Sequence, residues 1–195
     1  MKNLQSLLTD VRACQICADS LLHGVRPVVQ VSTAARILIA GQAPGSKVHA
    51  TGIPFDDPSG DRLRDWMGIS KDTFYDPTKI AILPMGFCYP GTGKSGDLPP
   101  RPECAPAWRK LLMNTMPNIR LTLVIGTYAL KWHMEEQRAK SLTETVKDWR
   151  HHISDGLLPL PHPSPRNNIW LKKNPWFKDD VLPELRARTA THLVS

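Results

Sequence analysis

The sequence predicts an α/β fold, a three-layer α/β/α sandwich around a short, mainly parallel, four-stranded central sheet. Two observations lead to this prediction. Apolar runs of strand length recur along the chain and stop at glycine or proline, and stretches of helical character lie between them. Strands that alternate with helices are typical of parallel sheets covered on both faces.

Local patterns place the elements in order. Apolar residues recur at helical spacing within residues 3–13, which predicts the first helix. The apolar runs predict strands over residues 36–41, 80–84, 121–126 and 157–160. Further helices are expected over residues 59–66, 106–113, 127–134, 142–149 and 179–188.

Length and composition limit the class of protein. With 195 residues, 41% of them apolar, the chain can form one domain with its own core, and we expect a single domain over residues 1–195. No apolar run approaches the roughly 20 residues of a membrane span, and the N-terminal residues lack a signal-peptide pattern. We therefore expect a cytoplasmic protein, a monomer, without a membrane partner.

The charge balance favours a polyanionic partner. The formal net charge is +7 and the pI is near 9.4, as in many proteins that bind nucleic acid. Late in the chain, basic residues alternate with aromatic ones: Arg166, Lys172, Lys173 and Lys178 with Trp170, Trp176 and Phe177. Such a segment either holds phosphates and stacks bases or is an amphipathic helix with its aromatic residues in the core.

Three long loops begin where predicted strands end, over residues 41–60, 84–101 and 161–168. The carboxyl ends of parallel strands meet at one edge of a sheet, and ligands bind beyond that edge. The sequence therefore predicts that these three loops converge on one site.

Four cysteines indicate a metal site. Cys14 and Cys17 form a Cys-x2-Cys pair, and fifteen residues separate Cys88 from Cys104. The thiols of a cytoplasmic protein stay reduced, and two thiolates at this short spacing can face one ion or cluster. The spacing does not separate zinc from iron–sulfur, and small buried side chains with a redox-active pair are the alternative.

Four segments together resemble the uracil-DNA glycosylase superfamily. They are Gly41-Gln42-Ala43-Pro44-Gly45, Gly52-Ile53-Pro54-Phe55 with Ser59-Gly60-Asp61, His162-Pro163-Ser164-Pro165-Arg166-Asn167, and the four cysteines. The cysteines are similar in placement to those that hold a [4Fe–4S] cluster in families 4 and 5. The resemblance covers about residues 10–180 and implies a [4Fe–4S] cofactor, with zinc as the other possible occupant, and DNA containing deaminated bases as the partner.

The resemblance implies a role for each pocket residue. Phe55 would stack on a base flipped out of the duplex. His162 would donate a hydrogen bond to the base and stabilise its negative charge as it leaves. The pocket around the base would be lined, largely through the backbone, by Gln42, Ala43 and Gly45.

The last of these segments would contact the DNA backbone. The resemblance implies that Ser164 meets the phosphates beside the flipped nucleotide. Pro165, Arg166 and Asn167 would enter the minor groove and fill the vacated stack.

The sequence departs from the family pattern at two places. Ala43 occupies the position at which the best-known uracil glycosylases carry an acid that orients water. The acid is expected instead at Asp57 or Asp56, and Asp57 is favoured. Both are also typical helix-capping residues. The stretch from Leu83 to Cys88 lacks the Asn that reads uracil, which favours a broader range of deaminated bases.

The expected activity is hydrolysis of the N-glycosidic bond of uracil or another deaminated base in DNA, by water and without a Schiff-base lysine. The alternative is an iron–sulfur protein of the same fold that binds nucleic acid and has lost the chemistry. Ala43 and the missing Asn favour the alternative, whereas Phe55, Asp57 and His162 together favour the enzyme.

Overall fold

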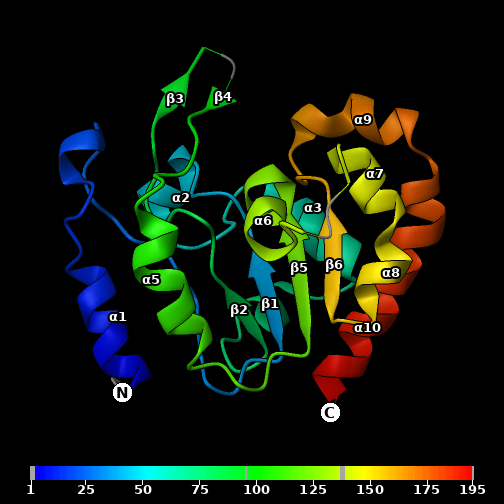
Figure 1. Cartoon of the computed structure of the whole chain (residues 1–195), viewed down its shortest axis with the longest axis horizontal. Coiled ribbons are helices and arrows are strands. Elements are labelled where there is room, and N and C mark those ends of the chain that lie inside the picture. The colour runs from blue at the N-terminus through cyan, green and yellow to red at the C-terminus, as the bar shows by residue number, and fades with distance from the viewer. Residues whose placement is uncertain (1–2, 95, 137–138, 195) are drawn as a thin grey trace.

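The computed structural model describes residues 3–94, 96–136 and 139–194 and shows a four-stranded sheet between helices (Figure 1). The strands stand in the order β2-β1-β5-β6, and each runs parallel to its neighbour. Their bounds are β1 Ile37–Ala40, β2 Ile80–Ile82, β5 Leu121–Ile125 and β6 Leu157–Leu160. This arrangement confirms the predicted α/β/α fold with its parallel sheet.

Helices form the two outer layers. The helices in the stretches where the sequence predicts helix are α1 (Leu4–Arg12), α3 (Pro58–Met67), α5 (Cys104–Met113), α6 (Gly126–His133), α7 (Leu142–Lys147), α8 (Trp149–Ile153) and α10 (Leu182–Val194). Further helical segments are η1 (Ala18–Ser20), α2 (Ser46–Thr51), α4 (Lys71–Phe74), η2 (Pro165–Asn167), α9 (Asn168–Lys173) and the π-helical turn η3 (Phe177–Val181). A small hairpin, β3 (Thr92–Gly93) and β4 (Gly96–Asp97), lies outside the main sheet.

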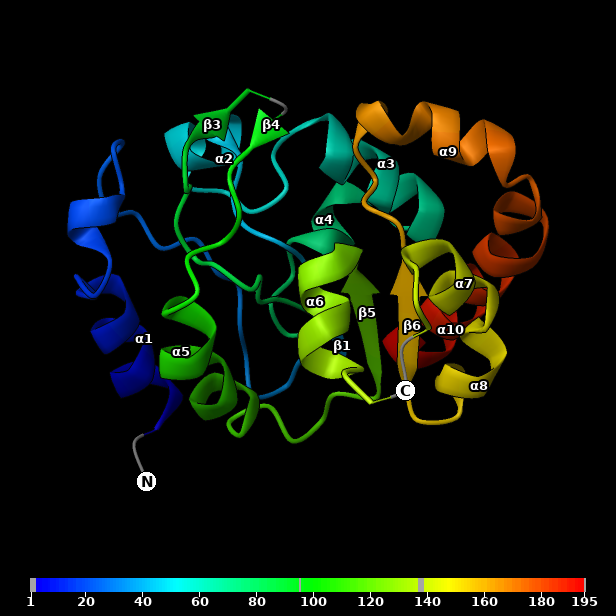
Figure 2. The ribbon, with the colours of Figure 1, turned by 45° about the horizontal axis from the view of Figure 1, so that its top comes forward.

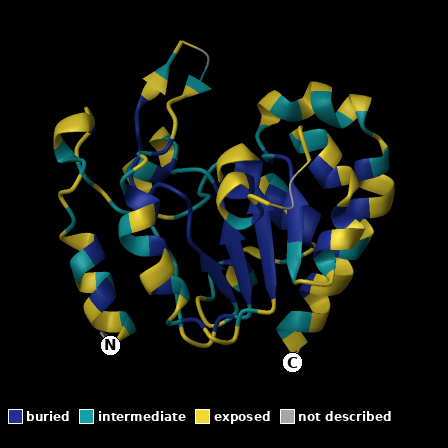
Figure 3. Cartoon of the chain, viewed as in Figure 1, coloured by how far each residue is buried: buried dark blue, intermediate teal, exposed yellow. Residues whose placement is uncertain are grey.

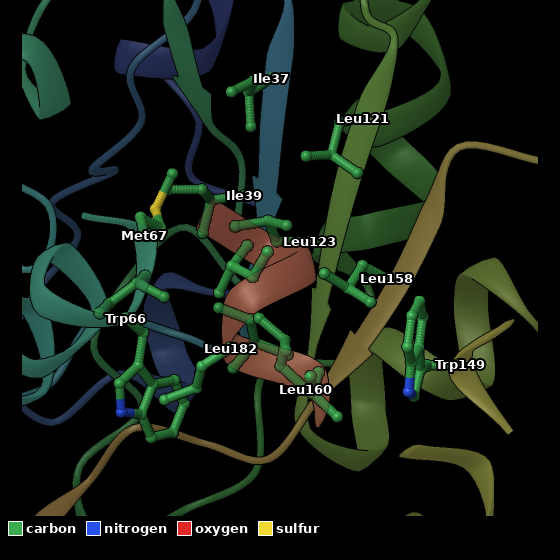
Figure 4. Close-up of a cluster of buried hydrophobic side chains, with 14 of the residues drawn as sticks. Ile37, Ile39, Trp66, Met67, Leu121, Leu123, Trp149, Leu158, Leu160 and Leu182 are labelled. Carbon is green, nitrogen blue, oxygen red and sulfur yellow. The ribbon is translucent and has the colours of Figure 1, made fainter. Parts of the chain in front are cut away.

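Helices cover both faces of the sheet, so the strands carry apolar side chains on both faces. Side chains such as Ile37, Ile39 and Leu123 point to the layer of α3 and α10, where Trp66, Met67 and Leu182 pack against them (Figure 4). Residues between them on the strands, such as Leu38 and Ala81, pack instead in a second cluster that contains residues of α1 and α5. Buried residues accordingly concentrate along the sheet, and exposed ones on the outer helix surfaces (Figure 3).

The predicted elements are present, with differences at their ends. The helix expected over residues 142–149 is divided at Asp148 into α7 and α8. The last helix is longer than expected, since helical structure begins at Phe177 and continues to Val194. Elements such as α2, α4 and the hairpin were not predicted, because pieces of two to six residues are too short to show a hydrophobic period.

The aromatic residues of the late segment belong to the core. Phe177 is buried, and Trp170 and Trp176 pack against it with ring centroids 5.6 and 6.4 Å away. The indole N–H of Trp170 donates to Thr143 Oγ1 at 2.8 Å. Of the two interpretations of this segment, the structure therefore favours the amphipathic helix. Within the described residues, no helix combines the length and apolar character that crossing a membrane requires.

A buried arginine secures the end of β2. Arg109 on α5 is fully buried and donates Nη1 to the carbonyl oxygens of Leu83 and Pro84, the two residues that follow the strand. Its Nη2 donates to Nε2 of His133 on α6 at 2.6 Å. Burial lowers the pKa of Arg109 to about 9. Burial, followed by the charge of Arg109, lowers the pKa of His133 to about 3, so His133 is a neutral acceptor at neutral pH.

This pair predicts a loss of stability in mild acid. As the pH falls from 7 to 5, the unfolded chain protonates His133 near its ordinary pKa while the folded protein does not. The free energy of unfolding should therefore drop by about 1–2 kcal/mol from this group. Urea unfolding at both pH values, for wild type and for His133→Gln, measures it. The Gln keeps an acceptor for Arg109 and does not titrate, so its pH dependence should be shallower; equal dependence would contradict the assignment.

Candidate active site

The loops that follow β1, β2 and β6 meet at the carboxyl edge of the sheet, as the parallel strands require (Figure 2). They surround a cavity of about 460 Å³. Nine of the predicted site residues line it: Gln42, Ala43, Gly45, Phe55, Asp57, His162, Ser164, Arg166 and Asn167.

The two candidate acids have different surroundings. Asp57 lines the cavity and caps α3, where its Oδ1 accepts a hydrogen bond from the N–H of Gly60 at 2.9 Å. Among the described residues no hydrogen bond engages Oδ2 of Asp57, so this oxygen remains free for a ligand. Asp56 instead lies 3.8 Å from Nζ of Lys71 and is not part of the lining. Capping and a role in the pocket are thus compatible in Asp57.

The aromatic residue of the pocket is held in an unusual backbone conformation. Phe55 has a φ of 55°, in the left-handed region that residues with a side chain rarely adopt. Its ring lies against Gly41 and makes an edge contact with Phe74, with ring centroids 6.1 Å apart. Gly60 lies directly against the carbonyl of Phe55, since a Cβ at Gly60 would be 1.8 Å from that oxygen. The strain at Phe55 therefore depends on a glycine five residues later.

His162 is arranged to donate a hydrogen bond while neutral. The backbone N–H of Ser164 donates to its Nδ1 at 3.2 Å, and a backbone N–H can only be a donor. The proton of the neutral ring consequently lies on Nε2. Burial lowers the pKa of His162, and the nearby carboxylates of Asp57 and Asp97 offset this only in part. At neutral pH the pocket thus contains an uncharged N–H donor.

The loop that carries His162 is tied to itself and to α3. Asn167 Nδ2 donates to the carbonyl oxygen of His162 at 2.7 Å, and Ser164 Oγ accepts the N–H of Arg166 at 3.2 Å. Arg62 on α3 donates to the carbonyl oxygen of Ser164 at 3.0 Å. The amide of Asn167 is therefore engaged within the loop, whereas no hydrogen bond within the described part of the chain uses the hydroxyl proton of Ser164.

Sequence reasoning did not identify two residues at this edge. Asp97, on β4, is a second acid in the cavity lining. Pro84 lines the cavity at the end of β2 and is fixed through its carbonyl by Arg109. Neither lies in a recognisable motif, and the only signal for Asp97 was its place in one of the three converging loops.

The four cysteines come together beside α1 and α5. They line one small cavity of about 20 Å³, with Cys88 and Cys104 buried and Cys14 and Cys17 half-buried. N–H groups point at two of the sulfurs at 3.3 Å: Trp108 Nε1 donates to Cys14 Sγ, and the backbone N–H of Phe87 donates to Cys104 Sγ. Within the described residues, however, no three His, Cys, Asp or Glu side chains are placed to hold a metal ion as they stand.

Burial keeps the thiols of Cys17, Cys88 and Cys104 protonated at neutral pH in the absence of a cation. It raises the pKa of Cys88 to about 11 and that of Cys104 to about 12. The pKa of Cys17 is raised as well, first by burial and then by the neighbouring Cys14. A bound cation or cluster would reverse this balance, because a coordinating thiol loses its proton.

Fold and pocket together define an α/β protein whose cavity at the carboxyl edge of the sheet is lined by an aromatic ring, an uncharged N–H donor and a carboxylate. The model of the Uracil DNA glycosylase superfamily matches residues 28–186, and the chain belongs to this superfamily. Its members are generally DNA glycosylases, which act on DNA. The matched region contains the three pocket loops and Cys88 and Cys104, while Cys14 and Cys17 precede it.

Because Gly60 lies against the carbonyl of Phe55, we predict that a methyl group added at Gly60 greatly lowers the stability of the fold. Gly60→Ala should lower the free energy of unfolding by about 3 kcal/mol or more, because the carbonyl of Phe55 has to move. Gly24→Ala is the matched control: Gly24 has a φ of +81° but no atom within 4 Å of an added Cβ, so it should lose only about 1 kcal/mol. Urea unfolding of both variants tests this, and similar losses would show that the close approach does not matter.

Proposed function

We propose that this protein is a monofunctional DNA glycosylase that hydrolyses the N-glycosidic bond of uracil or other deaminated bases in DNA. The observation that carries the proposal is the grouping of Phe55, Asp57 and His162 around one cavity at the carboxyl edge of the sheet. Membership of the superfamily and the net charge of +7 also support it.

The residues suggest how the reaction proceeds. A nucleotide turned out of the duplex enters the cavity, and its base stacks on Phe55. The bond between C1′ and the base nitrogen breaks, and its electron pair leaves with the base. Nε2–H of His162 donates to a base oxygen and stabilises this negative charge. Water then bonds to C1′, and its proton passes to the free oxygen of Asp57.

The pocket favours several deaminated bases over strict recognition of uracil. At the end of β2, where an amide side chain would read the base edge, Pro84 lines the cavity and offers no side-chain hydrogen bond. Large discrimination between bases requires polar groups that are left unpaired by the wrong base. A site without such a group at this position should accept uracil, hypoxanthine and xanthine with smaller differences in rate.

We also propose that the four cysteines hold a [4Fe–4S] cluster. The thiols converge on one cavity, and N–H groups point at two of the sulfurs, as is common around thiolate ligands. A tetrahedral zinc ion with Zn–S bonds of about 2.3 Å needs its sulfurs about 3.8 Å apart. A cluster of iron and sulfide is broader than one ion. Within the described residues no three His, Cys, Asp or Glu side chains are placed to hold a single ion, and this favours the cluster. Its contribution when bound would be structural, since it links the segment after α1 to the loop after β2.

Base release from DNA tests the glycosylase. Oligonucleotides with a single uracil, hypoxanthine or xanthine should lose the base with the wild-type protein, and Asp57→Asn should slow the single-turnover rate about 100-fold or more. Asn still caps a helix, so this variant removes the charge and keeps α3. Asp56→Asn is the matched control, because it changes the neighbouring acid outside the pocket and should leave the rate within a few-fold.

A different outcome would favour the alternative function. A wild-type protein that binds these oligonucleotides and releases none of the three bases is a nucleic-acid-binding protein of this fold. Ala43, which leaves the first pocket loop without an acid, is the observation in favour of that alternative.

Iron and acid-labile sulfide measured on protein purified without oxygen test the cluster. Equal amounts of the two are expected, with a visible absorbance that decreases on reduction. Cys104→Ser should lower both contents and the melting temperature, because the buried ligand is lost and the closed loop is released. Zinc without sulfide in the anaerobic protein would overturn the cluster assignment.

A further inference from the structure

The hairpin of β3 and β4 brings a second carboxylate to the pocket. Asp97 is on β4 and lines the same cavity as Asp57 and His162, but comes from the long loop after β2. In both views the hairpin stands near α2 at the edge of the sheet at which the pocket lies (Figures 1 and 2). The mechanism proposed above makes no use of this acid.

The carboxylate of Asp97 is held at one oxygen and free at the other. Thr92 pairs with Asp97 across the hairpin, and its Oγ1 donates to Asp97 Oδ1 at 3.3 Å. The hydroxyl of buried Tyr89 lies 2.5 Å from the same Oγ1, which connects the acid to the core. Among the described residues no hydrogen bond engages Oδ2 of Asp97. Asp57 has the same arrangement, with one oxygen on a helix cap and the other unused.

The free oxygen lies beside the first pocket loop. A Cβ added to Gly45 would be 3.4 Å from Asp97 Oδ2, so this oxygen lies at van der Waals distance from the space beside Gly45. No residue of the loop 41–45 is acidic. Asp97 therefore supplies a negative charge on the side of the cavity that this loop forms. The side chain is exposed, which places it at the mouth of the cavity and not at its base.

The hairpin is also in contact with the loop that carries His162. Gly96 has a φ of +135°, and a Cβ there would be 2.3 Å from Nη1 of Arg166. Arg166 therefore packs on the bare backbone of the residue next to Asp97. The charge of Asp97 reaches His162 from this side, as that of Asp57 does from α3. The two acids belong to one electrostatic environment.

We propose that Asp97 is a second catalytic carboxylate, which lies beside C1′ at the pocket mouth and stabilises the positive charge that develops on the sugar. This inference rests on the glycosylase function proposed above. A base that fills the cavity leaves its glycosidic bond at the mouth, where Asp97 is. As the bond breaks and the electron pair leaves with the base, the sugar becomes cationic, and a fixed carboxylate lowers the energy of that state. Asp57 still accepts the proton of the attacking water.

The test separates chemistry from binding. For Asp97→Asn we expect the single-turnover rate of uracil release to fall at least about tenfold. DNA affinity, measured by fluorescence anisotropy on the same oligonucleotide, should stay equal or increase, because a negative charge near the phosphates is removed. Asp97→Glu keeps the charge and should recover part of the rate.

Two control variants exclude an indirect effect. Asp155→Asn removes an exposed acid just before β6, at the opposite edge of the sheet, and should change neither rate nor affinity. Thr92→Val removes the hydrogen bond that orients Asp97 while leaving its charge, and should reduce the rate less than Asp97→Asn does.

Each outcome has a definite meaning. If Asp97→Asn releases uracil at the wild-type rate, this inference is wrong and the proposed glycosylase function stands. A fall in rate matched by an equal fall in affinity also overturns it, since Asp97 would then only support the hairpin. If Asp97→Asn does not fold, a rate in Asp97→Glu no higher than that of Asp57→Asn overturns it instead. A wild-type protein that releases no base removes the proposed function and this inference together.

Discussion

All four strands of the central sheet run in the same direction, and the site depends on this constraint. Loops from β1, β2 and β6 lie far apart in the sequence, yet parallel pairing brings their carboxyl ends to one edge. The register is maintained by apolar side chains on both faces, which α3 and α10 cover on one side. Arg109 then fixes the end of β2 through the carbonyl groups of Leu83 and Pro84, the two residues that follow the strand. The scaffold is thus rigid where the pocket begins.

Backbone contacts fix the orientation of the main pocket residues. Gly60 supports the left-handed Phe55, and the N–H of Ser164 sets the tautomer of His162. Asp57 is held by the helix that it caps. Donors and acids fixed in this way need little rearrangement when charge develops, and this preorganisation is how enzyme sites lower barriers. The same groups would also bind a base without reaction, so the proposed chemistry depends on Asp57 in the pocket and Asp97 at its mouth.

The cysteine cavity and the pocket share the loop after β2. Cys88 and Cys104 border the segment that contains the β3–β4 hairpin, and Asp97 lies within it. A cofactor on the cysteines would therefore fix both ends of the loop that carries the second carboxylate. The proposed cluster would therefore help to position Asp97 although it takes no part in the reaction.

The sequence by itself determined the fold class, the four strands and the convergence of the loops, because apolar periodicity and strand ends are local signals. It also indicated Phe55 and His162 as pocket residues, because they lie in motifs that resemble those of the superfamily; the residue types alone would not have identified them. The sequence favoured Asp57 over Asp56 as the acid, but only the tertiary structure shows that Asp57 lines the cavity while Asp56 lies near Lys71. The tertiary structure alone showed Asp97 beside Gly45, a contact between residues about fifty positions apart that no local pattern encodes.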